Sequence, residues 1–523
     1  MLGKSSKICG FIAASSFSLL TILSGAAQAG ETTLQSAPLN PNFVKAITKM
    51  QAAKAAGTWK PNVAKGGHGL GRLPDRIDHS YLLTAAKKER AASIQRNGAA
   101  AATTTMPAIY DLRTLGKIGS VKNQGDCGSC WDFAAMASLE STLPKGTAFS
   151  ENDVLDSDGF TLGPNDGGDD SMVIAYLTRW GGPKTETQYP YQYQWPEAPV
   201  ADTSTANTSV HVQDVYMVAP DPYDIKHAIW TNKGALTLSF YYDDSLYYQN
   251  VPGFSNVPSA ATIACFYNPY VSNDYFSLLP NGGGHEVAVI GWDDTYPASK
   301  FTPTGNTPPG DGAYLCRNEW GAYWGSKCGN GPQCTQGGYF YISYYDKSII
   351  NYGGPAYFYK PSPASAYTTV YQYDPLGQTR PWSYIDGSGK LLPDAWIANV
   401  FKADNAGSKI KAVGFYVNDA TASYEIKIYD NVQTDGNGNI TDPTNGTLVC
   451  DQLGGVQENG TASVPAGYHT IALKTPAKVT AGDNFSVVVH LKNDQGDGYP
   501  IAIEDQINND SYGYSDRAYS TPG

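Results

Sequence analysis

The 523-residue sequence is poor in charge and lacks long hydrophobic runs. Only 16% of the residues are charged, and no stretch after residue 29 approaches 18 consecutive apolar residues, so we expect no membrane span there. The chain has 36 basic and 48 acidic residues, and this shortage of positive charge disfavours a nucleic-acid binder that neutralises phosphates. What is present, 41% hydrophobic residues with 37 Tyr and 55 Gly, is typical of a folded, loop-rich, largely β protein outside the cell.

The few charges are unevenly distributed along the chain. Residues 1–106 contain 13 basic and 4 acidic side chains, whereas residues 107–523 contain 23 basic and 44 acidic ones. Within the first stretch, residues 30–106 have 11 basic and 4 acidic side chains, a net charge of +7. We therefore expect this N-terminal stretch to be attracted to the acidic remainder, and the attraction to weaken as salt rises.

The N-terminus has the features of a secretory signal peptide. Lys4 and Lys7 precede an apolar run at residues 11–23, and the sequence Ala-Gln-Ala then predicts cleavage after Ala29. A membrane anchor is the alternative, but the run is too short to span about 30 Å of hydrocarbon as a helix. We expect residues 1–29 to be removed and the protein to be secreted, either outside the cell or into the periplasm.

The rest of the chain divides into four segments by composition. Residues 30–106 have the position of a pro-region, and residues 107–359 form one unit of mixed helices and short strands. Residues 360–366, rich in Pro and Ser, are typical of an interdomain linker. Residues 367–523 contain period-2 strands separated by Asn-Gly and Asp-Gly turns, which predicts a β-sandwich or jelly roll.

Two helices are expected in the pro-region. Phe43, Ile47 and Met50 recur at helical spacing, and residues 81–97 have the pattern of a second, basic helix. The low-complexity Ala and Thr run at residues 99–105 is suited to a cleavable linker.

The chemistry is concentrated around Cys130. Ser129 followed three residues later by Asp132 predicts a helix N-cap, which would place Cys130 in the first turn. Unpaired backbone N–H groups and the helix dipole favour an anion there, so the thiol can ionise below its usual pKa and act as a nucleophile.

A thiolate nucleophile needs a proton-transferring partner, and residues 107–359 offer three histidines. His211 and His227 lie in regular strand and helix patterns, where a structural role is expected. His285 differs because the three glycines before it let the backbone approach closely, and the buried strand that follows would hold it rigidly. Asn318 could fix the tautomer of its ring, and Trp320 could shield that hydrogen bond.

The motif CGSCW at residues 127–131 matches the pattern C-G-[SA]-C-[WY] around the papain and cathepsin nucleophile, which expects His and Asn downstream. His285 and Asn318 follow Cys130 by 155 and 188 residues. Shorter matches lie at residues 107–113, 150–152, 167–168 and 186–191. Over residues 107–350 the sequence resembles a papain-like cysteine protease.

This resemblance implies an α+β, two-lobed papain-like fold with a helical lobe and a β-barrel-like lobe. It implies a secreted cysteine endopeptidase that cleaves polypeptides and requires no metal or cofactor. The implied catalytic residues are Cys130, His285, Asn318 and Gln124, the last as an oxyanion donor. The implied substrate-binding residues are Gly167, Gly168 and Trp320.

The two ends of the chain carry weaker resemblances. The pro-region is similar to short pro-regions of bacterial secreted relatives, and we expect it to inhibit from the cleft until removed. The C-terminal unit resembles a lectin-like β domain, for which a carbohydrate or cell-surface ligand is one interpretation. Two alternatives stay open: an adhesin or carbohydrate-binding protein with a structural protease-like unit, and acyl transfer to an amine by the same thiol.

Some positions depart from the family pattern. Asp132 either caps the helix or raises the thiol pKa, and Glu319 stands where the family usually has Ser. Asp169 and Asp170 lie where family members set specificity at the second substrate position, so they either favour a basic residue or are solvated.

The cysteines define a further departure. Seven remain after residue 29, an odd number that suggests one thiol outside disulfides in an oxidising compartment. Cys127 is normally bridged in the family to a Cys near the Gly pair, yet residues 131–264 contain none. Cys328 and Cys334 are close enough for a local bridge, and the remaining connectivity stays open.

Overall fold

A computed structural model describes residues 33–97, 106–192, 208–248, 264–272, 278–279, 281–304, 306–325, 337–404, 407–453, 463–494 and 498–504. The expected signal peptide at residues 1–29, residues 99–105, and the Cys328–Cys334 pair lie outside these ranges. In the described residues no helix has both the length and the apolar character needed to cross a membrane.

Residues 33–97, which we call the N-terminal segment, form two helices and three short strands. Their bounds are β1 (Thr33–Ser36), α1 (Pro41–Ala55), β2 (Asn62–Ala64), β3 (His68–Leu70) and α2 (Tyr81–Asn97). The two helices expected from the sequence are confirmed. Asn40 caps α1 by accepting from the backbone N–H of Asn42, and Phe43 and Ile47 are fully buried in a core shared with the following unit.

Residues 106–363, the first unit, contain four α-helices in the described ranges. They are α3 (Cys130–Ser141), α4 (Glu151–Ser157), α5 (Asp170–Thr178) and α6 (Pro222–Asn232). Every residue of α3 is buried, so this helix lies in the interior, with α4, α5 and the large sheet packed around it. Short helical turns are η1 (Leu112–Leu115), η2 (Asp244–Leu246), η3 (Ala298–Thr304), η4 (Ile349–Gly353) and, just beyond this unit, η5 (Ala364–Ala366).

A seven-stranded sheet in the first unit packs against α3. Its strands are β4 (Ile109–Asp111), β9 (Gly283–Asp293), β10 (Ala313–Arg317), β11 (Tyr339–Ser343), β8 (Cys265–Phe266) and β7 (Tyr247–Tyr248), in that order, with β6 (Leu236–Tyr242) also paired to β9. The first ten residues of β9 are buried, which fits a central strand covered on both faces. In the described residues this sheet does not close into a barrel, so the β-barrel-like lobe is an open sheet.

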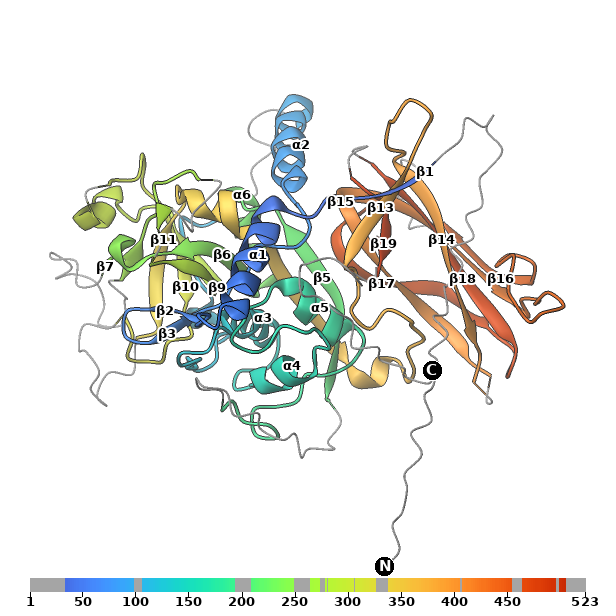
Figure 1. Ribbon diagram of the computed structural model, residues 1–523. Helices are drawn as coiled ribbons and strands as arrows, with labels where there is room; N and C mark the ends of the chain where they lie inside the picture. Colours follow the sequence, from blue (N-terminus) through green and yellow to red (C-terminus); the bar gives the residue numbers. More distant parts are fainter. Residues whose placement is uncertain are drawn as a thin grey trace, which may run out of the picture.

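A second seven-stranded sheet joins the first unit to the C-terminal unit, residues 367–504. Its order is β12 (Ala356–Pro363), β5 (Val210–Val218), β17 (Ser463–Lys478), β15 (Lys409–Asp430), β18 (Asn484–Asn493) and β14 (Asp394–Lys402), with β16 (Thr447–Leu453) on β15. Figure 1 shows β5 between the two units. The linker expected at residues 360–366 therefore begins as paired strand, because Lys360 lies opposite Asp214 on β5.

A smaller three-stranded sheet completes the C-terminal unit. Strand β13 (Arg380–Ile385) pairs with β19 (Ile501–Ile503) on one side and with β1 of the N-terminal segment on the other. The core of this unit includes Phe485, Ile426 and Ile428, three of the residues that alternate in the sequence. The fold is thus α+β followed by a β-rich unit, and the N-terminal segment contacts both.

Candidate active site

Cys130 is the first residue of α3 and its side chain is fully buried. Burial raises the pKa of its thiol to about 12, and backbone hydrogen bonds with Gly71 and Glu286 oppose that shift only in part. Glu286 directly follows His285 on β9, so these contacts place the thiol beside the His-bearing strand. With the N-terminal segment in place, Cys130 is a protonated thiol.

His285 lies on β9 and Asn318 just after β10, and the two strands are paired. His285 Nε2 is 2.8 Å from Asn318 Oδ1. Because an amide oxygen only accepts, Nε2 carries the proton and Nδ1 of the neutral ring is left as an acceptor. Nδ1 is buried and has no hydrogen-bond partner in the described residues. Burial lowers the pKa of His285 to about 3, so the ring is neutral here.

Trp320 covers the imidazole as the sequence predicts. Its ring stacks on His285 with centroids 4.6 Å apart, and Tyr242 and Trp324 meet it edge-on. On the N-terminal segment, His68 also stacks on Trp320, at 4.9 Å. This aromatic cluster keeps water from the His285–Asn318 hydrogen bond.

Gln124 is fully buried, and its side chain points into the same site. Its Nε2 donates to the carbonyl of Gly69 at 3.2 Å and to that of Cys127 at 2.8 Å. The Gln124 amide thus donates to a peptide carbonyl of the N-terminal segment, as a donor to a substrate oxyanion would have to do.

Backbone hydrogen bonds hold the N-terminal segment in this site. Gly168 N donates to Gly71 O and Leu73 N donates to Gly168 O, both at 2.9 Å, while Arg72 N donates to Gly284 O at 3.0 Å. The Arg72–Gly168 pair is a parallel bridge. A peptide backbone therefore already occupies the groove between α5 and β9.

The glycines predicted for close approach are required by this fit. A Cβ on Gly167 would lie 2.2 Å from Gly71 O, and one on Gly284 would lie 2.0 Å from Arg72 O. A Cβ on Gly168 would instead lie 2.5 Å from the ring of Trp131. Larger residues at the first two positions would displace the bound backbone.

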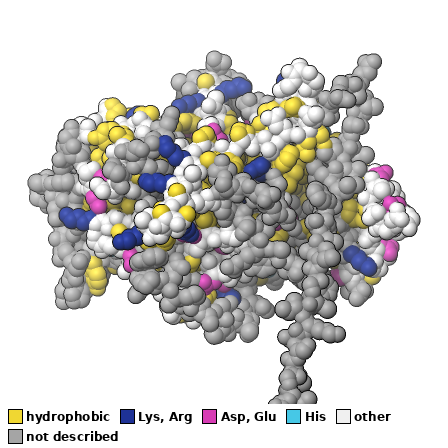
Figure 2. Space-filling view, viewed as in Figure 1, with side chains coloured by type: hydrophobic (Ala, Val, Ile, Leu, Met, Phe, Trp, Pro, Cys, Tyr) yellow, Lys and Arg dark blue, Asp and Glu magenta, His cyan; other side chains and the backbone are white. Residues whose placement is uncertain are grey.

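Ion pairs also join the basic segment to the acidic first unit. Lys54 pairs with Asp166 at 2.5 Å, and Arg90 with Asp221 and Asp224, each at 2.8 Å. Figure 2 shows Lys and Arg side chains spread in separate places over the face that carries α1 and α2. The expected attraction between the N-terminal segment and the first unit thus includes these individual ion pairs.

Ser129 is the N-cap of α3, as predicted, but the capping hydrogen bond expected of its side chain is absent. Its Oγ instead hydrogen-bonds the hydroxyl of Tyr191 at 2.9 Å. Asp132 is fully buried, and neither carboxylate oxygen has a hydrogen-bond partner in the described residues. Burial, then repulsion from Glu151, raises the pKa of Asp132 well above its usual range.

Glu319, the other departure beside the site, is buried behind Asn318. Burial raises the pKa of Glu319 to about 8, and its Oε1 lies 3.7 Å from Nε of Arg317. Its backbone carbonyl accepts from Gln124 N at 2.8 Å. The substitution is accommodated, and Asn318 keeps its bond to His285.

No disulfide joins the five described cysteines to one another. Cys127 Sγ is 3.4 Å from the carbonyl of Pro164, close to the Gly pair. Three residues that line the site were not selected from the sequence as site residues: Arg72, Glu286 and Ser239. A clue was present, since Arg72 stands among apolar and glycine residues at positions 69–74, and Glu286 directly precedes the apolar run at residues 287–290.

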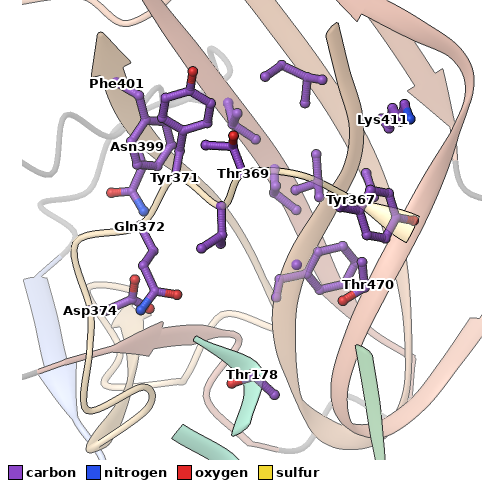
Figure 3. A pocket seen from close by; sticks show the side chains of 18 of the residues that line it. Thr178, Tyr367, Thr369, Tyr371, Gln372, Asp374, Asn399, Phe401, Lys411 and Thr470 are labelled. Atoms are coloured by element: carbon purple, nitrogen blue, oxygen red, sulfur yellow. The ribbon is translucent and has the colours of Figure 1, made fainter. Parts of the chain in front are cut away.

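A second feature lies in the C-terminal unit. A cavity of about 560 Å³ opens there, bounded by β14, β15 and β17 and by residues 367–377. Figure 3 shows Thr178 of α5 at one end of it. Polar side chains from Thr369, Gln372, Asn399 and Thr470 and rings from Tyr367, Tyr371 and Phe401 line its wall.

Known proteins match both units of the chain. The family model "Papain family cysteine protease" matches residues 106–331, and "Lectin like domain" matches residues 370–520. A viral cathepsin of Heliothis zea nuclear polyhedrosis virus is 41% identical over 91 residues, 17% of this chain and 24% of that protein. Cysteine proteinase 3 of Solanum lycopersicum is 29% identical over 226 residues, 42% of this chain and 54% of that protein. The chain thus matches about half or less of the length of these curated relatives.

Solved structures show the same fold over both units. The cysteine protease and lectin-like domains of Cwp84, a surface layer associated protein of Clostridium difficile, superpose with a TM-score of 0.66. The match covers 94% of this chain and 92% of that one, at 19% identity. A clostridial Cwp84 structure after propeptide cleavage gives a TM-score of 0.59 at 22% identity, over 78% and 90% of the two chains. The chain therefore contains a papain-family cysteine protease domain followed by a C-terminal lectin-like domain.

Proposed function

We propose that the protein is a secreted cysteine endopeptidase, made as an inactive precursor that the N-terminal segment holds closed. One observation carries the proposal: a peptide already lies in the groove, bonded to Gly168 and Gly284, with a carbonyl on Gln124. A groove that binds peptide backbone beside a thiol and an imidazole is suited to peptide cleavage.

The chemistry follows from the roles proposed for four residues. Once the segment leaves, water reaches the site and favours the ionised forms of both Cys130 and His285. The Cys130 thiolate then attacks the scissile carbonyl carbon, and the oxyanion is held by the Gln124 side chain and the Cys130 backbone N–H. Imidazolium gives its proton to the leaving amine as the C–N bond breaks. A water molecule, deprotonated by His285, releases the acyl group, and Asn318 keeps the ring oriented throughout.

Active-site titration tests the proposal. We expect a thiol-directed epoxide to label the processed protein at one thiol per chain with complete loss of peptide cleavage, and Cys130→Ala to take up no label there. Cys450→Ala is the matched control, since Cys450 is a partly exposed cysteine on β16, and it should be labelled as wild type is. If the wild-type protein neither reacted with the epoxide nor cleaved peptides, the structural, adhesin-like alternative would be favoured. Transfer of the acyl group to added amines in preference to water would favour the acyl-transfer alternative.

Carbohydrate binding by the lectin-like domain is a second candidate, favoured by the lining of the cavity. Amide and hydroxyl groups can hydrogen-bond sugar hydroxyls, while aromatic rings cover the apolar faces of a sugar. We expect Asn399→Ala and Gln372→Ala to weaken binding of the full-length protein to an immobilised oligosaccharide by about tenfold each, the size of one lost hydrogen bond. Asn437→Ala, in the exposed turn at residues 435–439, should bind as wild type does. Equal binding by all variants would rule out this cavity as the sugar site.

A further inference from the structure

The side chain of Arg72 is enclosed in the groove beside the thiol, with no exposed surface. Its Nε lies 2.8 Å from Glu286 Oε2 and 2.7 Å from Ser239 Oγ. One terminal nitrogen pairs with Asp75 and lies 3.3 Å from Asp170 Oδ2. The guanidinium is therefore held on several sides, by hydrogen bonds to Ser239 and Asp170 and by an ion pair with Glu286.

These partners come from two different parts of the chain. Asp75 belongs to the N-terminal segment and leaves with it, whereas Asp170 on α5, Glu286 on β9 and Ser239 on β6 belong to the first unit. The first unit thus has a pocket of its own with two fully buried carboxylates, each with no exposed side-chain surface.

The carboxylate of Asp170 is fixed by its surroundings. The hydroxyl of Tyr359 donates to Asp170 Oδ1 at 2.8 Å, and that of Thr237 lies 3.4 Å from the same oxygen. Its other oxygen faces Arg72. In the described residues no other Lys or Arg forms an ion pair with Asp170 or Glu286. Once Arg72 has left, the two neighbouring carboxyl groups have no cation among the described residues, so the pocket is complementary to an incoming positive charge.

The pocket lies where a substrate side chain would enter. The residues on either side of Arg72, Gly71 and Leu73, are bonded to Gly168, and Arg72 N donates to Gly284 O. Gly71 also hydrogen-bonds the thiol of Cys130. A substrate whose backbone pairs with Gly168 in the same way would present a side chain to the same pocket. This is the region expected to set specificity at the second position before the scissile bond.

We propose that this pocket selects a basic side chain, arginine above lysine, at the second position of the substrate, with Asp170 and Glu286 as the specificity-determining residues. The inference rests on the proposed peptidase function. Arginine is preferred because its planar fork can meet Glu286, Ser239 and Asp170 at once, as Arg72 does, whereas an ammonium is a single compact charge.

The test compares peptides that differ only at that position. Fluorogenic peptides carry arginine, lysine, leucine or citrulline there, citrulline being the uncharged isostere of arginine. For the processed protein we expect kcat/KM to be on the order of 100-fold higher for arginine than for citrulline, as for pairing in a buried charged site, with lysine between them. Asp170→Asn and Glu286→Gln should each lower the arginine-to-leucine ratio by about 10- to 100-fold. Glu425→Gln, on the lectin-like domain, is the control and should leave that ratio unaltered.

The outcomes separate this inference from the peptidase proposal. Equal cleavage of the arginine, citrulline and leucine peptides would overturn the inference while leaving the peptidase function intact. Failure to cleave any peptide, together with no epoxide labelling of Cys130, would overturn the peptidase function itself. The arginine–citrulline comparison uses wild-type protein, so it decides the matter even where a variant fails to fold, and epoxide titration identifies such a variant.

Discussion

Replacing His285 by Ala is expected to lower kcat/KM for peptide cleavage by about 10⁴- to 10⁶-fold, as loss of the catalytic base does in other nucleophilic hydrolases. His285 has an unpartnered Nδ1 and a Nε2 fixed by Asn318, so no other described side chain can take over proton transfer at the thiol. The measurement is kcat/KM on the best arginine peptide, with active-site concentration set by epoxide titration.

Two further variants separate catalysis from folding. Asn318→Ala should lower kcat/KM by roughly 100-fold, because it loosens the ring without removing the base. His227→Ala is the matched control: His227 lies on α6, where it stacks on Tyr223, and we expect less than a twofold change. Similar losses for His227 and His285 would contradict the assignment, since they would indicate a common structural defect.

Much of the candidate site could be predicted from the sequence because its chemistry is encoded locally. The spacing of Ser129 and Asp132 placed Cys130 at a helix start. The glycines before His285 indicated a close backbone approach, and residues 71–72 lie there in the structure. The side-chain bond expected of the Ser129 cap is absent because a distant side chain, Tyr191, hydrogen-bonds its hydroxyl. A local sequence pattern cannot predict a competing hydrogen-bond partner that lies far away in the sequence.

The parts that could not be predicted depend on pairing between distant segments. Strand β5 pairs with β12 on one side and with β17, some 250 residues later, on the other, so one sheet spans both units. The Pro-rich stretch at residues 360–363 has the composition of a linker, yet pairing with β5 makes it a strand. The role of Glu286 was hidden for the same reason, since only the fold brings Arg72 to it.

Replacing Arg72 by Met is expected to release the N-terminal segment, raising the rate of Cys130 labelling in the full-length precursor by about 100-fold. Met keeps the apolar stem but leaves Asp75, Asp170 and Glu286 facing one another without their cation, and breaking a buried pair costs about 3–5 kcal/mol. The measurement is the second-order rate of epoxide labelling, and its final stoichiometry reports whether the site is still folded. Arg90→Met is the matched control: Arg90 also pairs with two aspartates, but its side chain is 28% exposed, so only a few-fold rise is expected.

Buried groups on both sides of the closed site set the direction of the pH dependence. Burial raises the pKa of Asp170 and of Glu286, so these two carboxyls give up protons when water reaches them on release. Burial lowers the pKa of His68, His79 and His285, so these three rings take up protons on release. Three rings against two carboxyls give a net uptake of protons, and acid therefore favours release.

Labelling of the wild-type precursor, relative to processed protein at the same pH, should rise from pH 7 to pH 4. Arg72→Met should show a flatter profile, because its segment is already released at neutral pH. A wild-type ratio that stays constant or falls over this range would show that these histidines do not control the hold of the segment.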